Sequence, residues 1–324
     1  ESNNILSDSQ HGFRQKQSCE TQLLQFTNDL FNKLPDGSQF DVAIMDFSEA
    51  FDVVPHKKLL LKLEHYGICG NTLQWITSFL NNRTQKVLVD GEASSEAPVT
   101  SGVPQGSVLG PILFLAFIND MPDSVDSKCR LFADDSIIYR EIKSPDDTKI
   151  LQEDLIKLTS WEQKWGMSFN PSKCNIMHIT RKRNPSKSIY FLKGEALEPL
   201  DSAKYLGVNI TNDLSWNKHI DSISKKGNQT LGFVKRNIPK SSPTSTKDMA
   251  YKTLVRPQLE YASCVWDPYQ QYLVHQLEMV QRRAARYALG FPLFSQDSVS
   301  NMLNILKWEE LQLRRWKAKL IMTF

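Results

Sequence analysis

Two adjacent acidic residues, Asp134 and Asp135, lie between two short β-prone runs, and they constrain the chain more than any other feature. The apolar run 129–133 precedes them and the run 136–139 follows them. This pattern predicts two antiparallel strands joined by a tight turn that carries two carboxylates. Aspartate is common in turns for conformational reasons alone. The turn by itself therefore leaves a structural and a chemical role open.

Composition bounds the class of protein. The chain has 324 residues, 40% of them hydrophobic, which is enough for one large core or two smaller ones. Its five cysteines are scattered without any C-x-x-C pair, which argues against a disulfide framework or a zinc ribbon and favours a reducing compartment. The longest apolar run, 108–118, is too short to span a bilayer, and the polar start is unlike a signal peptide. We therefore expect no membrane partner.

The order of the expected elements indicates an α+β fold. Ser18 is a suitable N-cap for a first helix, Gly166 a suitable stop for a long one, and a Gly-rich loop at 101–107 opens an apolar helix. After Trp216 the pattern is helical only, which places a domain boundary near residue 212. Strands are expected at 40–47, 174–180, 188–192 and 204–211, a hairpin from Val87, and helices at 56–66, 71–82, 108–121 and 145–165.

The carboxylates form a candidate site. Asp46 ends the buried strand 40–47, and Asp134 lies at the tip of the acidic turn. If those strands are neighbours, two or three carboxylates meet at one edge of a sheet and require cations, because buried like charges repel. Mg²⁺ prefers oxygen ligands, and two such ions roughly 3.5–4 Å apart can support phosphoryl transfer. The alternative is that Asp46 merely caps its strand.

Three motifs in this order resemble the core of reverse transcriptases: 46–52 (DFSEAFD), 101–107 (SGVPQGS) and 132–135 (FADD). The contexts DVVPH at 52–56 and GVPQGSVLGP at 102–111 are similar to non-LTR (LINE-type) retrotransposons of the jockey type. Further agreement comes from QHGFR at 10–14, WGMSFNPSK at 165–173 and YLG at 205–207. The resemblance covers roughly residues 10–290.

The resemblance implies a right-hand polymerase. Residues 1–211 would form a palm with part of the fingers, 212–290 a helical thumb, and 291–324 a helical extension. The implied reaction is RNA-directed DNA synthesis on an RNA template, extending a DNA primer with dNTPs. Nuclear and cytoplasmic location is implied with it; oligomeric state is left open. The alternatives are a weak or inactive nucleic-acid-binding remnant of such an element, a group II intron maturase-like polymerase and a telomerase-like one.

The family roles map onto individual residues. Asp46 and Asp134 resemble the metal-binding aspartates, with Asp135 beside them and the carbonyl of Phe47 completing a site for two Mg²⁺ ions, which Mn²⁺ could replace. Lys173 resembles a general acid for the pyrophosphate, although a surface lysine is a comparable alternative.

The nucleotide site is implied by the same resemblance. Phe51 matches the steric gate against ribonucleotides, and Gln105 and Gly106 match the loop beside the incoming nucleotide. The chain starts at Glu1 without an initiator methionine, so we expect a piece of a longer protein that lacks the N-terminal fingers and the endonuclease. Arg14 is then the candidate for gripping the triphosphate, and nucleotide binding should be weak.

Nucleic-acid contacts are expected from the last third of the chain. Lys204, Tyr205 and Gly207 match the primer-grip hairpin. The thumb residues Arg282, Arg283 and Arg286 lie largely off the apolar stripe 277, 280, 284, 287 and 288, where they could follow phosphates or simply form a solvated face. Three aromatic residues are expected in the core rather than as stacking platforms for bases: Trp216, Trp266 and Tyr269.

Overall fold

The computed structural model describes residues 5–291 and 299–323. Its contacts divide the chain into two compact units between Asp201 and Ser202. The sequence placed the change of character near residue 212, whereas the structure groups the hairpin just before it with the helical unit. The reason is that the hairpin's second strand contacts the first long helix of that unit.

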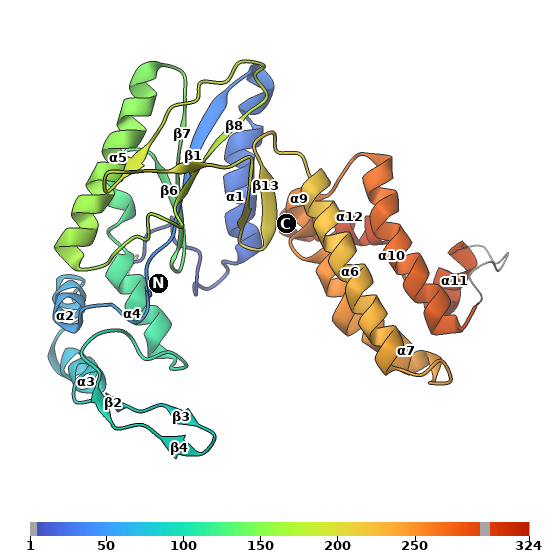
Figure 1. The fold of residues 1–324 in the computed structure, drawn as a ribbon, viewed down its shortest axis with the longest axis horizontal. Coiled ribbons are helices and arrows are strands. Elements are labelled where there is room, and N and C mark those ends of the chain that lie inside the picture. Colours follow the sequence, from blue (N-terminus) through green and yellow to red (C-terminus); the bar gives the residue numbers. More distant parts are fainter. Residues whose placement is uncertain (1–4, 292–298, 324) are drawn as a thin grey trace. The chain divides into compact units, whose positions relative to one another are not determined.

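A five-stranded sheet organises the first unit, in the order β11-β8-β1-β7-β6 (Figure 1). The central strand β1 pairs antiparallel with both β7 and β8, β6 pairs antiparallel with β7, and only the short β11 runs parallel to its neighbour. This is the mainly antiparallel sheet that the sequence predicted. The strands are β1 (Gln39–Met45), β6 (Lys128–Phe132), β7 (Asp135–Glu141), β8 (Asn175–Thr180) and β11 (Glu198–Pro199).

Helices cover both faces of this sheet. Successive strand residues point to opposite faces, and β7 shows it: Ile138 joins the core cluster that includes helix α5 (Pro145–Trp165), while Tyr139 meets Phe26 of α1 (Cys19–Phe31) edge-on at 5.2 Å. Figure 1 shows these two helices on either side of the strands. The predicted start of α1 and end of α5 are confirmed, since Ser18 caps α1 and Gly166, in a left-handed conformation, ends α5.

The described part of the first unit also contains three shorter helices, two 3₁₀ turns and six short strands outside the five-stranded sheet. The predicted helix 108–121 is shorter in the structure and ends at Ile118; a separate 3₁₀ turn begins at Pro122, whose ring is incompatible with the interior of an α-helix. The helices are α2 (His56–His65), α3 (Gly70–Leu80) and α4 (Leu109–Ile118), with 3₁₀ turns at Leu34–Asp36 and Pro122–Ser124. The short strands are β2 (Thr84–Gln85), β3 (Leu88–Val89), β4 (Glu92–Ala93), β5 (Ala97–Pro98), β9 (Phe191–Leu192) and β10 (Glu195–Ala196).

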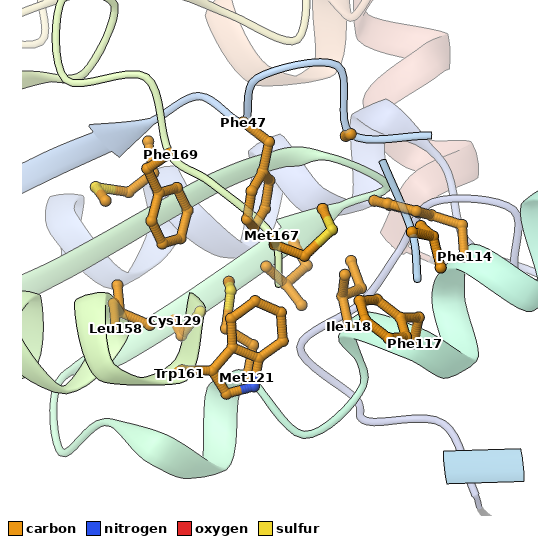
Figure 2. Packing of buried hydrophobic residues seen from close by; sticks show 14 of the residues in the cluster. Phe47, Phe114, Phe117, Ile118, Met121, Cys129, Leu158, Trp161, Met167 and Phe169 are labelled. Carbon is orange, nitrogen blue, oxygen red and sulfur yellow. The ribbon is translucent and has the colours of Figure 1, made fainter. Parts of the chain in front are cut away.

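The core reaches the end of β1. Phe47 stacks on Phe169 with ring centroids 4.3 Å apart, and Trp161 of α5 lies 6.3 Å from the Phe47 ring. Figure 2 shows these rings together, with Phe114 and Phe117 of α4 beside them. All five rings are buried. This packing fixes the backbone where β1 ends and Asp46 begins.

The second unit is helical apart from one hairpin. The predicted strand 204–211 is in fact β12 (Ser202–Tyr205) and β13 (Val208–Thr211) around a turn at 206–207. Trp216 and Trp266 are buried as expected, but Tyr269 is 86% exposed, so that prediction was wrong. The helices are α6 (Asn217–Asn237), α7 (Thr244–Ala250), a π-helical turn (Tyr251–Val255), α8 (Arg256–Glu260), α9 (Ser263–Trp266), α10 (Gln271–Leu289), α11 (Val299–Leu306) and α12 (Leu311–Thr323). No helix in the described part of the chain is long and apolar enough to cross a bilayer.

Candidate active site

The register of the sheet brings the predicted carboxylates together. Met45 pairs with Ser136, so the next residue of that chain, Asp46, comes beside Asp135. Phe132 pairs with Asp135, which leaves a two-residue turn with Asp134 at its tip. The condition set by the sequence, that β1 and the acidic hairpin be neighbours, is therefore met.

The three carboxylates influence one another electrostatically. Partial burial, and secondarily the charge of Asp46, raise the pKa of the Asp134 carboxyl above its ordinary value. The pKa of Asp135 is also raised, first by loss of hydration and then by the charges of Asp134 and Asp46. Both raised pKa values mean that ionising these carboxyls is energetically unfavourable, and a bound cation would stabilise the ionised forms.

The backbone around Asp46 is held by the segment 168–174. Asn170 N–H donates to the Asp46 carbonyl at 2.8 Å, and Ser48 N–H donates to the Ser168 carbonyl at 2.8 Å. Phe47 and Phe169 thus form a bridge whose hydrogen bonds come from the flanking residues. The main-chain groups of neighbouring residues in an extended chain point to opposite sides. This bridge fixes the main chain on both sides of Phe47, and completion of a metal site by the Phe47 carbonyl stays a prediction.

Lys173 is adjacent to the first carboxylate. Its Nζ lies 3.6 Å from Asp46 Oδ2, although the lysine side chain is 66% exposed. The Asp46 Oδ2 atom itself is buried and accepts no hydrogen bond from the described residues. A buried anionic oxygen without a donor is a suitable ligand for a metal ion.

These residues fit magnesium by their chemistry. Carboxylates and a backbone carbonyl are hard oxygen donors, and Mg²⁺ is usually held by one or two carboxylates together with waters and substrate phosphates. Within residues 5–291 and 299–323, no group of three or more His, Cys, Asp or Glu residues stands ready to hold a metal.

The predicted gate and the Gly-rich loop are tied to each other. The Phe51 ring stacks on Phe114 at 4.2 Å, and its carbonyl accepts a 2.8 Å hydrogen bond from Val103 N–H. Gly102 has φ +86°, and a Cβ there would lie 2.6 Å from the Asp52 carbonyl oxygen, so only glycine fits. The predicted partners Phe51 and loop 101–107 therefore share one local structure.

A cavity of about 570 Å³ opens beside this loop. Gln105 lines it and donates from Nε2 to Asp52 Oδ1 at 2.8 Å, while Gly106 is exposed with φ +79°. Arg83 lines the same cavity, and the sequence analysis had not singled it out. Its position directly before β2, outside any motif, gave no signal for this role.

The N-terminal motif 10–14 lies on the far edge of β6. Gln10 forms a parallel bridge with Leu131. The side chain of Arg14 is only 14% exposed, and its Nη1 donates to the Ser7 carbonyl at 2.7 Å. This hydrogen bond holds the segment itself, and a grip on a triphosphate stays a prediction.

The second unit contains the remaining predicted residues. Lys204 is exposed, but the Tyr205 side chain is buried, and contact of this hairpin with nucleic acid stays a prediction. Gly207 has φ +85°, and a Cβ there would meet the Tyr261 ring at 2.9 Å.

The three arginines of α10 differ in exposure. Arg283 is exposed and its Nη1 donates to Asn228 Oδ1 of α6 at 2.9 Å. Arg282 and Arg286 are half-buried. Their roles in binding nucleic acid remain predictions.

Comparison with known families agrees with this geometry. The sequence model of the family described as "Reverse transcriptase (RNA-dependent DNA polymerase)" matches residues 1–210. The chain belongs to the reverse transcriptase family. The matched region contains the sheet, the acidic turn and the Gly-rich loop, so the family assignment rests on the same residues as the site.

Curated relatives place the chain near the jockey type, as the motifs indicated. It is 28% identical over 313 residues to "Probable RNA-directed DNA polymerase from transposon X-element" of Drosophila melanogaster, covering 92% of this chain and 34% of that protein. It is 28% identical over 296 residues to "RNA-directed DNA polymerase from mobile element jockey" of the same species, covering 88% and 32%. The chain thus spans about a third of the length of these relatives.

Among solved structures, apo telomerase from Candida tropicalis is similar with a TM-score of 0.49 and 12% identity, covering 95% of this chain and 51% of that one.

Proposed function

We propose that this reverse transcriptase chain carries out RNA-directed DNA synthesis for a non-LTR retrotransposon. The reaction transfers a nucleotide from a dNTP to the 3′-hydroxyl of a DNA primer paired with an RNA template. The observation that carries the proposal is the meeting of Asp46, Asp134 and Asp135 at one end of the sheet. In this proposal residues 1–211 would form the palm with part of the fingers, residues 212–290 the thumb and residues 291–324 a helical extension.

The carboxylates and the Phe47 carbonyl would hold two Mg²⁺ ions, with Mn²⁺ as a possible substitute. The chemistry that such ions supply is activation of the 3′-hydroxyl and neutralisation of charge on the leaving pyrophosphate. The contribution of the chain is the strand register that places Asp46 next to the turn carrying Asp134. The raised pKa values of Asp134 and Asp135 favour occupancy by cations.

Neighbouring side chains would act on the nucleotide. Lys173, whose Nζ lies 3.6 Å from Asp46 Oδ2, would donate a proton to the departing pyrophosphate. Phe51, fixed by its stack on Phe114, would exclude the 2′-hydroxyl of a ribonucleotide. The cavity lined by Gln105 and Arg83 would receive the nucleotide or the template base opposite it.

Templated primer extension tests the proposal. The 324-residue chain should extend a DNA primer on an RNA template with dNTPs and Mg²⁺, and should stop when the metal is chelated. Binding of the primer–template without any extension, in Mg²⁺ or Mn²⁺ and at high dNTP concentration, would instead identify a non-catalytic binding remnant.

A further inference from the structure

The buried side chain of Gln10 holds the acidic turn from outside the sheet. Its Oε1 accepts a 2.9 Å hydrogen bond from Ala133 N–H, and its Nε2 donates to the Ala133 carbonyl at 3.4 Å. The same Oε1 accepts from Gly12 N–H at 2.7 Å. Gln10 is only 1% exposed. One side-chain amide thus bonds both main-chain groups of the residue that precedes Asp134.

Ala133 is a residue that needs such support. Its φ is +53°, in the left-handed region that side chains other than glycine adopt at a cost. It is the first residue of the two-residue turn between β6 and β7, a position that often contains glycine. The direction in which Asp134 leaves the turn depends on this conformation.

The rest of the N-terminal segment brings Gln10 to this position. His11 N–H donates to the Leu131 carbonyl at 2.9 Å, and Leu131 N–H donates to the Ser9 carbonyl at 2.8 Å. Gly12 approaches so closely that a Cβ there would lie 2.4 Å from Ala133 N. The segment therefore pairs with β6 and places the Gln10 amide against the turn.

We propose that Gln10 is a positioning residue for the metal-binding carboxylates, a role that rests on the proposed function. It contacts the backbone of Ala133 and not the reacting atoms. By fixing Ala133 in its unusual conformation, Gln10 sets the approach of Asp134 toward Asp46. Residues that orient metal ligands in this way typically change metal affinity or activity about 10–100-fold when they are lost.

The chain contains a matched control at the opposite end of β1. Gln39 is also 1% exposed, and its amide likewise bonds both main-chain groups of one residue: Ser186 N–H at 2.9 Å and the Ser186 carbonyl at 2.6 Å. Its Nε2 also donates to Asp41 at 2.8 Å. Replacing either glutamine removes a comparable buried amide clamp, but only Gln10 holds the acidic turn.

The experiment compares Gln10→Met with Gln39→Met in the 324-residue chain. Mn²⁺ binding is titrated by electron paramagnetic resonance, thermal unfolding is recorded, and extension gives kcat and the KM for primer–template. Gln10→Met should weaken Mn²⁺ binding about tenfold or more and lower kcat, with the KM for primer–template unchanged. Gln39→Met should lower the unfolding temperature while keeping Mn²⁺ affinity within about twofold of wild type, since its clamp lies away from the metal ligands.

A more conservative variant keeps the test possible if Gln10→Met does not fold. Gln10→Asn keeps an amide that is one methylene too short to reach both Ala133 atoms, so it should weaken Mn²⁺ binding in the same direction. Unchanged Mn²⁺ affinity in the folded Gln10 variants, or equal weakening by Gln39→Met, would overturn the inference. If wild type binds no Mn²⁺, or Asp134→Asn leaves Mn²⁺ binding intact, the proposed function fails and the inference fails with it.

Discussion

Cys174 and Asp46 are joined at both main-chain atoms of the aspartate. Asp46 N–H donates to Cys174 Sγ at 3.3 Å, and the thiol donates to the Asp46 carbonyl at 3.7 Å. Burial raises the pKa of this thiol to about 11, so it stays protonated and able to donate at neutral pH. Cys174, the residue directly before β8, therefore supports the main chain of the first carboxylate, in addition to the hydrogen bond that Asn170 N–H donates to the Asp46 carbonyl.

Replacing this thiol should affect chemistry as well as stability. Cys174→Ala leaves Asp46 N–H without its acceptor, which costs about 1–3 kcal/mol of unfolding free energy, and should lower kcat about tenfold. Cys129→Ala, which removes a buried thiol from β6, is the control. It should lower stability without changing kcat. Equal kcat values in the two variants would show that Cys174 only packs.

The gate prediction concerns sugar selection. Phe51→Val should raise ribonucleotide incorporation relative to dNTP incorporation about tenfold or more, because a smaller side chain leaves room for the 2′-hydroxyl. Phe117→Leu alters the same core through α4 but leaves the Phe51 ring in place, and should keep the wild-type ratio. Single-nucleotide incorporation with both sugars gives the ratio. An unchanged ratio in Phe51→Val would remove the gate from the proposal.

The thumb prediction concerns salt dependence. Replacing Arg282, Arg283 and Arg286 by Gln should weaken primer–template binding and flatten its salt dependence. Each lost phosphate contact removes about 0.7–0.9 from the slope of log K against log salt. Arg283 should contribute most, since it is the exposed member.

A second triple variant, with the same loss of formal charge, tests whether net charge alone explains the effect. Replacing the exposed loop residues Arg181, Lys182 and Arg183 by Gln removes the same formal charge from the other unit. Its slope should change less than that of the α10 variant. Equal changes in both would mean that overall charge, and not this helix, sets the binding.

The stability of the second unit should depend on pH through His219. Burial lowers its pKa from 6.5 to about 4, so the folded chain keeps this imidazole neutral where the unfolded chain binds a proton. The contribution of the neutral His219 side chain to the unfolding free energy is complete above about pH 6.5 and falls as the pH drops toward 4. Between pH 7 and pH 5 the free energy of unfolding should fall by about 2 kcal/mol through this histidine.

The difference between variants isolates this effect. The free-energy gap between wild type and His219→Gln should narrow as the pH falls from 7 to 5, as measured by denaturant unfolding. The control is His275→Gln, which replaces an exposed histidine of α10, and the difference in unfolding free energy should narrow more for His219→Gln than for this control. A constant gap for His219→Gln would contradict the assignment.

Much of the fold was accessible from sequence because local signals were strong. Ser18 and Gly166 limit their helices as predicted, and the turn carrying Asp134 needed only its two flanking β-prone runs. The meeting of Asp46 with Asp134 required one further condition, that their strands be neighbours. Local sequence patterns do not reveal which strands are neighbours in a sheet. The expectation that these two strands are neighbours came instead from the order of the motifs, through the family resemblance.

The supporting residues were not accessible in the same way. Gln10 and Cys174 act through hydrogen bonds to residues more than a hundred positions away, and neither is charged or otherwise distinctive as a residue type. Tyr269 was assigned to the core because aromatic residues are usually buried, and its sequence context does not reveal that its side chain is exposed. Such features depend on the assembled fold.

The most direct test of the two-metal assignment is the substitution Asp134→Asn. It removes one charge at the tip of the turn and keeps the shape of the side chain. Extension should fall more than about a hundredfold, because the loss of even a supporting residue costs 10–100-fold. The Kd for primer–template should stay within about twofold, since phosphate contacts dominate that affinity. Asp123→Asn, at an exposed position before β6, should leave both quantities unchanged. Wild-type extension by Asp134→Asn would contradict the account.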